Sequence, residues 1–256
     1  FVHYASLHSC TKTAPYAAQA TSALCALLNG INMEQLKSWE PLQGSVLRTY
    51  TRNTPCEDIF QAVCNELGEY YKLHGFKYAK SGPHITGKVG DIRFKLAFWS
   101  SRSNTMGEYV NLEMIPSFKS ISLEKKLGKE ESYIWGHPDI CYRHIDCSNK
   151  CDVIVRYPFE PDLEREDTHY KNRLILSNNV NLWDIDEDKF VKLVNFINEH
   201  IVNIIYTLQD EVLLRDYLSS LDDFSKNKIT SGNSKLSKYL NNLYPEFYSE
   251  LTNRGM

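Results

Sequence analysis

The amino-acid sequence predicts an α+β fold, with an antiparallel sheet of four to six strands covered by amphipathic helices and followed by a helical C-terminal tail. Three patterns support this prediction. Helical periodicity begins at Pro55, strand-like alternation fills 83–114, and a longer helical pattern begins near Asp184. A helix followed by clustered strands and then by further helices is the order of an α+β domain, because alternating β-α units would place a helix after each strand.

The first predicted helix begins after Thr54 and ends before Gly75. Its apolar side chains recur at spacings of three and four residues: Ile59, Val63, Leu67 and Tyr70. Thr54 is the predicted N-cap, Pro55 suits the first helical position, and Glu57 stands at capping-box spacing from Thr54. We expect Gly75 to take the left-handed conformation that ends many helices.

Alternation of apolar and polar residues predicts three consecutive strands: 83–89, 92–98 and 110–114. The Gly90-Asp91 pair is a predicted hairpin turn between the first two strands. Turn-forming residues separate the second strand from the third, and Pro116 is expected to end the third. Weaker alternation predicts two further strands, at 153–157 and 173–176.

The longest predicted helix begins at Asp184, the expected N-cap, with Glu187 at capping-box spacing. One apolar stripe runs along it: Phe190, Val194, Ile197, Ile201, Ile204, Leu208 and Val212. A polar linker is expected at 226–234. A short helical tail over 236–243 follows, and Pro245 is expected to break or restart that helix.

We divide the chain into three parts. Residues 1–32 are a predicted weakly structured or non-native extension, because Lys12 is their only residue of the Lys, Arg, Asp and Glu types. Ordinary charge density begins at Met33, which we expect to be the natural start or to lie near it. Residues 33–225 form one predicted α+β domain. Residues 226–256 form the linker and a helical tail that packs on that domain.

The composition is that of an ordinary globular protein, with 42% hydrophobic and 24% charged residues and a formal net charge of -3. No apolar run approaches the ~20 residues that span a bilayer, so we expect no membrane insertion. Seven cysteines without a regular framework favour reduced thiols and a cytoplasmic location. The net charge excludes a strong chain-wide attraction to nucleic acid but leaves room for a local basic patch.

Reactive side chains are densest in one segment: His137, Cys141, His144, Cys147 and Cys151. Thiolate and imidazole ligands hold tetrahedral zinc in many proteins, which makes this segment the candidate metal or thiol site. No C-x-x-C pair is present, so the primary interpretation is a loop and a strand edge that are rich in Cys and His and hold no cofactor, with zinc as the alternative. The sequence also lacks a G-x-S-x-G elbow, a Walker motif and a dinucleotide fingerprint, and we predict no catalytic residues.

An acidic run supplies the candidate partner-binding residues: Glu160, Asp162, Glu164, Glu166 and Asp167. Such a run forms a recognition surface for a basic partner or, more commonly, a solvated loop. A second candidate surface is an aromatic face on the sheet: Tyr78, Trp99, Tyr109, Tyr133 and Trp135. Packing in the core or at an interface explains aromatic residues in strands equally well.

Several short motifs lie between Pro55 and Leu218: Gly75-Phe76-Lys77, Val89-Gly90-Asp91, Phe94-Lys95-Leu96-Ala97-Phe98, Gly107-Glu108-Tyr109-Val110-Asn111-Leu112, Asp139-Ile140-Cys141-Tyr142-Arg143, and Trp183 ahead of a long helix. Together they resemble the bacterial domain-of-unknown-function family 4304. The chain departs from that family at His144, where another basic residue is expected, and extends past its usual end. The family has no assigned catalytic residues, so the resemblance transfers no site. By analogy with comparable small α+β proteins, it implies an immunity or defence role.

Three functions therefore stand side by side. The first is a non-catalytic protein-binding domain in a bacterial toxin-immunity or defence system. The second is a metal- or thiol-dependent enzyme that uses the 137–151 segment. The third, less expected, is a nucleic-acid-associated subunit that uses basic residues around the predicted sheet: Lys72, Lys77, Lys80, Lys88, Arg93 and Lys95. We expect another protein as the partner and no membrane, and the sequence predicts no oligomeric state.

Overall fold

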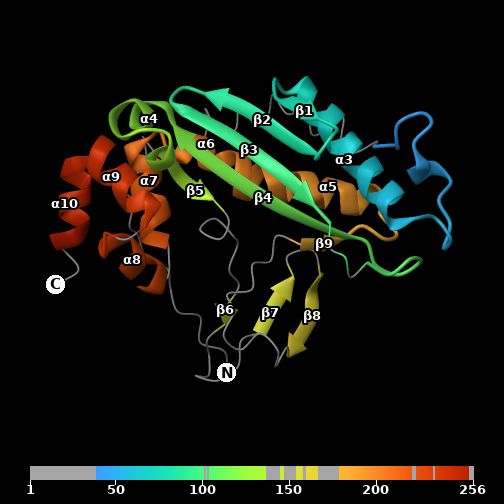
Figure 1. The fold of residues 1–256 in the computed structure, drawn as a ribbon. Coiled ribbons are helices and arrows are strands. Elements are labelled where there is room, and N and C mark those ends of the chain that lie inside the picture. The colour runs from blue at the N-terminus through green and yellow to red at the C-terminus, as the bar shows by residue number, and fades with distance from the viewer. Residues whose placement is uncertain are drawn as a thin grey trace, which may run out of the picture.

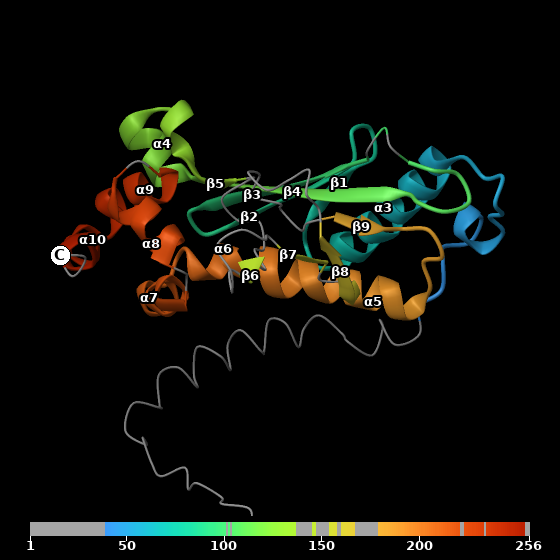
Figure 2. The ribbon, with the colours of Figure 1, turned by 90° about the horizontal axis from the view of Figure 1, so that it is seen from below.

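The computed structural model describes residues 39–100, 102, 104–136, 145–146, 154–157, 160–166, 179–220, 223–232 and 234–253. Its main body is a six-stranded antiparallel sheet with helices on one face (Figure 1). Seen from below, α5 and α6 form a layer on one side of this sheet, while α4 rises on the other side at one end (Figure 2). The predicted α+β architecture is confirmed.

The six strands follow one another along the sheet in chain order, except for the last. The order is β1 (Lys77–Ala79), β2 (His84–Val89), β3 (Ile92–Trp99), β4 (Asn111–Ser120) and β5 (Tyr133–Gly136), and β9 (Asn179–Asn181) pairs with the first part of β4. A three-stranded sheet contains β6 (Ile145–Asp146), β7 (Ile154–Tyr157) and β8 (Glu160–Glu166). The predicted hairpin across Gly90-Asp91 and the predicted strand at 153–157 are confirmed, whereas 173–176 lies outside the described residues.

The prediction that Pro116 ends its strand is wrong, because β4 continues through it to Ser120. The Ile121 amide donates to the Asp91 carbonyl, and hydrogen-bonded pairs alternate along an antiparallel ladder. Pro116, opposite Leu96, therefore stands at a position whose amide would point away from β3. On that other edge it lies between the residues that pair with β9 and those that pair with β5. A proline is tolerated there, since no ladder bond is lost.

α3 (Cys56–Leu73) confirms the first predicted helix, but its N-cap differs from the predicted one. Pro55 occupies the N-cap position and makes no side-chain capping bond. The Thr54 hydroxyl instead accepts a hydrogen bond from the Thr51 amide, in the turn before the helix. The local turn therefore takes the hydroxyl that the capping-box pattern assigned to the helix.

The other end of α3 follows the sequence prediction. Gly75 has a positive φ of 83°, its amide donates to the Lys72 carbonyl, and the Phe76 amide donates to the Tyr71 carbonyl. These two bonds form the Schellman motif, and the Tyr71 and Phe76 rings meet edge to face at 5.7 Å. The chain thus turns directly from α3 into β1, which packs back on the helix.

The second long helix contains an irregular turn in its middle. α5 (Glu187–Phe196) begins at Asp186, whose side chain accepts from the Lys189 amide, so the predicted cap at Asp184 is wrong. Asp184 has a φ of 56° in the preceding turn. A π-helical turn, η4 (Ile197–Val202), then leads into α6 (Asn203–Thr207). This helix supplies much of the core: Phe190, Leu193, Val194, Ile197, Ile201, Ile204 and Ile205 are buried.

The predicted stripe does not continue to Val212, because the helix stops at Leu208. The Leu208 carbonyl accepts hydrogen bonds from the Tyr239 hydroxyl at 2.6 Å and from the Tyr244 hydroxyl at 3.2 Å. Asp210 then caps a new helix, α7 (Glu211–Ser220), by accepting from two of its first amides. Val212 is consequently 51% exposed.

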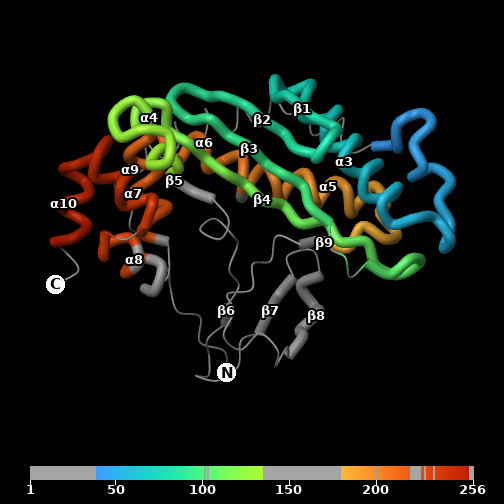
Figure 3. Tube along the Cα trace, in the orientation of Figure 1, coloured from blue at the N-terminus to red at the C-terminus, as the bar shows by residue number. Residues whose placement is uncertain are grey.

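The C-terminal region is more helical than predicted. α8 (Asp223–Thr230) covers part of the expected linker, so the described residues of 226–232 are a helix end and a turn rather than a linker. α9 (Lys235–Leu243) confirms the predicted tail helix, and Pro245 starts α10 (Pro245–Asn253). Leu236, Tyr239, Leu240 and Phe247 belong to the core cluster that also contains the sheet residues. The tail lies beside the end of the sheet that leads into α4 (Figure 3).

Three short elements complete the described chain. η1 (Val46–Arg48) precedes α3, α4 (Ile121–Leu127) follows β4 directly, and η2 (Glu130–Ser132) leads into β5. The Ser120 hydroxyl caps α4 by accepting from the Leu123 amide. Within the described ranges, we find no helix with the length and apolarity needed to cross a bilayer.

Candidate functional site

The side of the six-stranded sheet that faces away from α5 is the candidate site, and we call it the open face. Along β3, Ile92, Phe94, Leu96 and Phe98 are buried, whereas Arg93, Lys95, Ala97 and Trp99 alternate with them on the other side. Figure 1 views the sheet from this side, with α5 and α6 behind it. The described helices lie behind the open face or border its end.

The strand register arranges the open face in rows that cross the sheet. The first row is Lys88 on β2, Arg93 on β3, Lys119 on β4 and Tyr133 on β5. The second row is Lys77 on β1, Thr86 on β2, Lys95 on β3 and Ser117 on β4. Five cations are thus neighbours across four strands. We call Lys77, Lys88, Arg93, Lys95 and Lys119 the basic half of the open face.

Like charges directly opposite one another destabilise a sheet, and the first row contains three of them. Nearby groups offset the charge of two of these three residues. Arg93 forms a salt bridge of 2.7 Å with Glu124 of α4, and the Lys119 ammonium lies 3.9 Å from the centre of the Tyr133 ring. Within the described residues, Lys77, Lys88 and Lys95 have no carboxylate at salt-bridge distance. The basic half therefore has more positive charge than its surroundings neutralise.

A sixth cation reaches the same place from the C-terminal tail. Lys235, in the first turn of α9, lies with its ammonium 4.8 Å from the centre of the Tyr133 ring. Lys119 and Lys235 therefore share one aromatic ring, which attracts both cations but leaves their mutual repulsion in place. An anion bound near this ring would relieve that repulsion.

The other half of the open face is small and apolar. Its third row is Ala79, His84, Ala97 and Ile115, and in its fourth row Trp99 stands opposite Glu113. We call Ala97, Trp99 and Ile115 the apolar half. Trp99 is 49% exposed, which is large for an indole at the end of a central strand. Glu113 is the one carboxylate at the open-face positions of β1 to β4.

His84 stands between the two halves on β2. Its Nδ1 lies 2.7 Å from the Gly82 carbonyl oxygen. A carbonyl can only accept, so Nδ1 carries the proton in the neutral ring and Nε2 is left as an acceptor. The row that contains His84 thus offers one hydrogen-bond acceptor beside the apolar floor formed by Ala97 and Ile115.

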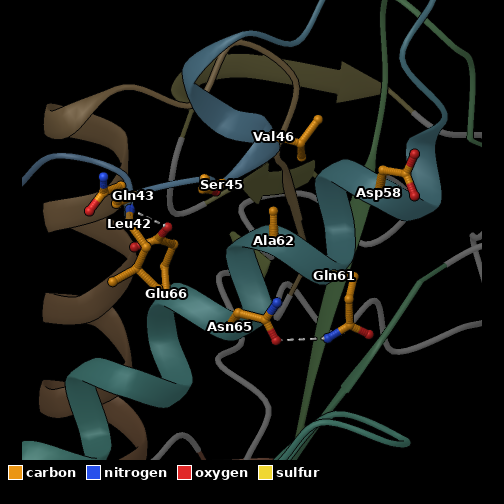
Figure 4. A pocket seen from close by; sticks show the side chains of 10 residues that line it. Leu42, Gln43, Ser45, Val46, Asp58, Gln61, Ala62, Asn65 and Glu66 are labelled. Atoms are coloured by element: carbon orange, nitrogen blue, oxygen red, sulfur yellow. Dashed lines mark hydrogen bonds between the residues drawn. The ribbon is translucent and has the colours of Figure 1, made fainter.

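A groove of about 390 Å³ lies elsewhere, between the chain before α3 and the first turns of that helix (Figure 4). Its polar groups bond one another. The Gln61 amide and the Tyr78 hydroxyl both donate to Asn65, and the buried Glu66 carboxylate accepts from the Leu42 amide at 2.8 Å. Burial raises the pKa of Glu66. These contacts fasten the chain before α3 to the helix, and we assign them a structural role.

The predicted metal or thiol site lies outside the described residues, since His137, Cys141, His144, Cys147 and Cys151 all do. The part of the chain that the structure describes contains no group of His, Cys, Asp and Glu side chains arranged to hold a metal ion. Its two cysteines are unpaired: Cys56 is half-buried, and burial raises the pKa of the Cys64 thiol. The Cys56 thiol donates to the Tyr109 carbonyl at 3.9 Å, and Cys64 belongs to the apolar core.

The predicted acidic surface falls partly on a strand. Glu160, Asp162, Glu164 and Glu166 occupy alternate positions of β8, so the expectation of a loop is wrong for this stretch, and Asp167 lies outside the described residues.

The residues of the predicted aromatic face do not all share one side of the sheet. Trp99 and Tyr133 are on the open face, whereas Tyr78 packs on the opposite side against Gly68 of α3 and Tyr109 lies in the β3–β4 loop.

Among the candidate residues predicted from the sequence, the basic residues of the nucleic-acid hypothesis share one surface most completely. Lys77, Lys88, Arg93 and Lys95 share the open face, whereas Lys72 pairs with Glu69 on α3 and Lys80 lies in the turn after β1. Sequence reasoning missed Lys119 and Lys235. Lys119 alternates with buried Phe118 in β4, which is the pattern of a half-buried strand. The expectation that Pro116 ends the strand excluded both residues from the predicted sheet. Nothing local to Lys235 indicates that α9 packs beside β5.

Comparisons with known proteins add no relative. No protein-family model matches the chain, and neither does any curated protein or any solved structure.

Proposed function

We propose that this protein binds nucleic acid and holds the phosphate backbone on the basic half of the open face. The observation that supports this most directly is the charge of that face, where five cations stand against two carboxylates, Glu113 of β4 and the Glu124 of α4 that pairs with Arg93. The proposal takes up the third hypothesis from the sequence, because four of its six basic residues share this surface.

The physical argument is one of local charge. The net charge of the whole chain is -3, so long-range attraction to a polyanion is weak. Within the basic half the balance is reversed, and the like charges of Lys88, Arg93 and Lys119 repel one another in the free protein. Phosphates bound there would remove that repulsion and release their own counterions, which is the main source of affinity in non-specific nucleic-acid binding.

The test is a titration of a fluorescein-labelled twelve-nucleotide poly-dT followed by fluorescence anisotropy at low salt. We expect the Lys95→Glu variant to bind about tenfold more weakly than wild type, since the change removes one phosphate contact and adds a repulsive charge. Lys192→Glu is the matched control, because Lys192 is also exposed but lies on α5, behind the sheet. Equal losses in both variants, or no binding by wild type, would contradict the proposal.

A protein partner is the second candidate, and exposed apolar side chains favour it. Met106 is 54% exposed and Trp99 49% exposed at the same end of the sheet, and both residue types are enriched at protein interfaces. The proposal retains a cytoplasmic binding role in toxin immunity or defence, without catalysis. Co-purification with the product of a neighbouring gene should be lost in Met106→Asp and kept in Leu73→Asp, whose leucine is exposed far away on α3.

The enzyme hypothesis remains a prediction about the 137–151 segment. It requires that purified protein contain about one zinc per chain, or that one thiol react faster than the others. Metal analysis and thiol labelling of the native protein measure both.

A further inference from the structure

The open face changes character along its strands. Its first two rows contain the cations, the third contains Ala97 between His84 and Ile115, and the fourth contains Trp99. Adjacent rows are two residues apart along each strand, about 6.7 Å. Trp99 therefore stands about 13 Å from Lys95 on the same strand, with a small-residue floor between them.

This order matches the layout of a nucleotide. Phosphates on the first two rows would run across the strands, and the bases attached to them would point along the strands over Ala97 towards Trp99. A base in that position has a flat apolar floor beneath it, the His84 acceptor beside it and an indole at its far end. Base stacking on exposed aromatic side chains of a sheet is a recurring way of holding single strands.

We infer that the open face selects single-stranded over double-stranded nucleic acid by stacking a base on Trp99. This inference rests on the proposed function. In a duplex the faces of the bases are already stacked on their neighbours, so the indole could meet only backbone and would add no affinity. In a single strand the bases are free to stack, and each such contact strengthens binding substantially.

The surface also has the extent of a short single-strand site. From β1 to β5 the sheet spans about 19 Å, since neighbouring strands lie about 4.8 Å apart. Lys235 extends the positive charge beyond β5 onto α9. A single strand of about four to six nucleotides would cross this width. Trp99, on the central strand β3, would therefore meet a base in the middle of the bound segment.

The experiment compares three labelled probes by anisotropy: twelve-nucleotide poly-dT, twelve-nucleotide poly-rU and a twelve-base-pair DNA duplex. Wild type should bind at least one single strand more than tenfold more tightly than the duplex. Trp99→Ala should weaken single-strand binding about tenfold and leave duplex binding unchanged, whereas Trp99→Phe should restore most of the affinity. Val212→Ala is the control, because Val212 is 51% exposed, close to the 49% of Trp99, but lies on α7 and outside the rows.

The outcomes separate this inference from the proposed function. If Lys95→Glu weakens all three probes but wild type binds duplex and single strands equally, nucleic-acid binding stands and strand selection by Trp99 is wrong. If Trp99→Ala binds every probe as wild type does, the stacking contact is wrong. If no probe binds at low salt, both proposals fail. Tighter binding of poly-dT or of poly-rU than of the duplex supports the inference and identifies the preferred strand.

Discussion

At the scale of single residues, the buried polar contacts of this protein join elements that are far apart in the chain. The Tyr71 hydroxyl, on α3, donates to the Asn198 side-chain carbonyl at 2.8 Å, and both residues are almost fully buried. Asn198 lies in the π-helical turn, where the Asn203 amide donates to the Asn198 carbonyl five residues back. The irregular turn thus places a polar side chain against α3 in the middle of an apolar interface.

This contact gives a first prediction. Tyr71→Phe should lower the free energy of unfolding by about 1–3 kcal/mol, because it leaves the buried Asn198 carbonyl without a donor. Urea denaturation measures the change. Tyr248→Phe is the control, since the Tyr248 hydroxyl makes no hydrogen bond with another described residue and its loss should change stability by less than about 0.5 kcal/mol. A similar small effect for Tyr71→Phe would show that the hydrogen bond contributes little.

His74, at the C-cap of α3, gives a prediction about pH. Burial lowers its pKa from the usual value of 6.5, because its ring lies against Tyr70 and its buried Nε2 has no hydrogen-bond partner in the described part of the chain. The unfolded chain therefore takes up the proton more readily than the folded chain. The contribution to stability is present above pH 6.5 and is lost as the pH falls through the lower, folded-state pKa.

His74→Leu should remove this pH dependence while keeping an apolar contact with Tyr70. Urea midpoints measured at pH 7.5 and pH 5.5 should differ less in the variant than in wild type. His84→Leu serves as the comparison, because His84 lies on the open face and its Nδ1 is already hydrogen-bonded. The idea fails if wild type and His74→Leu lose the same stability between the two pH values.

At the scale of elements, α3 and β1 pack more closely than two ordinary side chains allow. Gly68 faces the Tyr78 ring, and a Cβ added to Gly68 would come within 2.3 Å of two ring carbons. Tyr78 is held there because its hydroxyl donates to Asn65 and β1 pairs with β2. The close contact with Tyr78 therefore requires a glycine in the middle of α3, despite the poor helix propensity of that residue.

Gly68→Ala tests this packing directly. Helix propensity alone predicts a gain of about 1 kcal/mol in the free energy of unfolding. We expect instead a loss of about 1–3 kcal/mol, because the added methyl group overpacks the contact with Tyr78. Thermal or urea unfolding distinguishes the two signs. The double variant Gly68→Ala/Tyr78→Leu should recover part of the loss, whereas a stabilised single variant would show that the ring moves aside freely.

The sequence predicted elements well where local chemistry decided them. The 84–99 hairpin follows from alternation and the Gly90-Asp91 turn, and the end of α3 follows from Gly75. Prediction from the sequence failed where a contact with a distant part of the chain determines where an element ends. The helix stops at Leu208 because tyrosines of the tail bond its carbonyl, and β4 passes Pro116 because the neighbouring strands leave that edge unpaired. The cations of the open face were visible individually, but their rows depend on strand register.

At the scale of the whole molecule, the sheet, the long helix and the tail share one apolar core. Leu236, Tyr239 and Leu240 of α9 are buried in the same cluster as the inner residues of β3 and β4. The tail is therefore fastened to the sheet, and Lys235 is held beside β5 by this packing. With its inner face committed to the core, the sheet has the open face for contact with a partner.

The central claim is that the basic half neutralises phosphates, and the salt dependence of binding measures this most directly. For a single strand, the slope of log K against log salt concentration is about −0.7 for each neutralised phosphate, so the five cations predict a slope of about −3.5. Lys88→Ala should reduce the slope to about −2.8, and Lys192→Ala should leave it unchanged. A slope near zero, or one that Lys88→Ala does not alter, would contradict the claim.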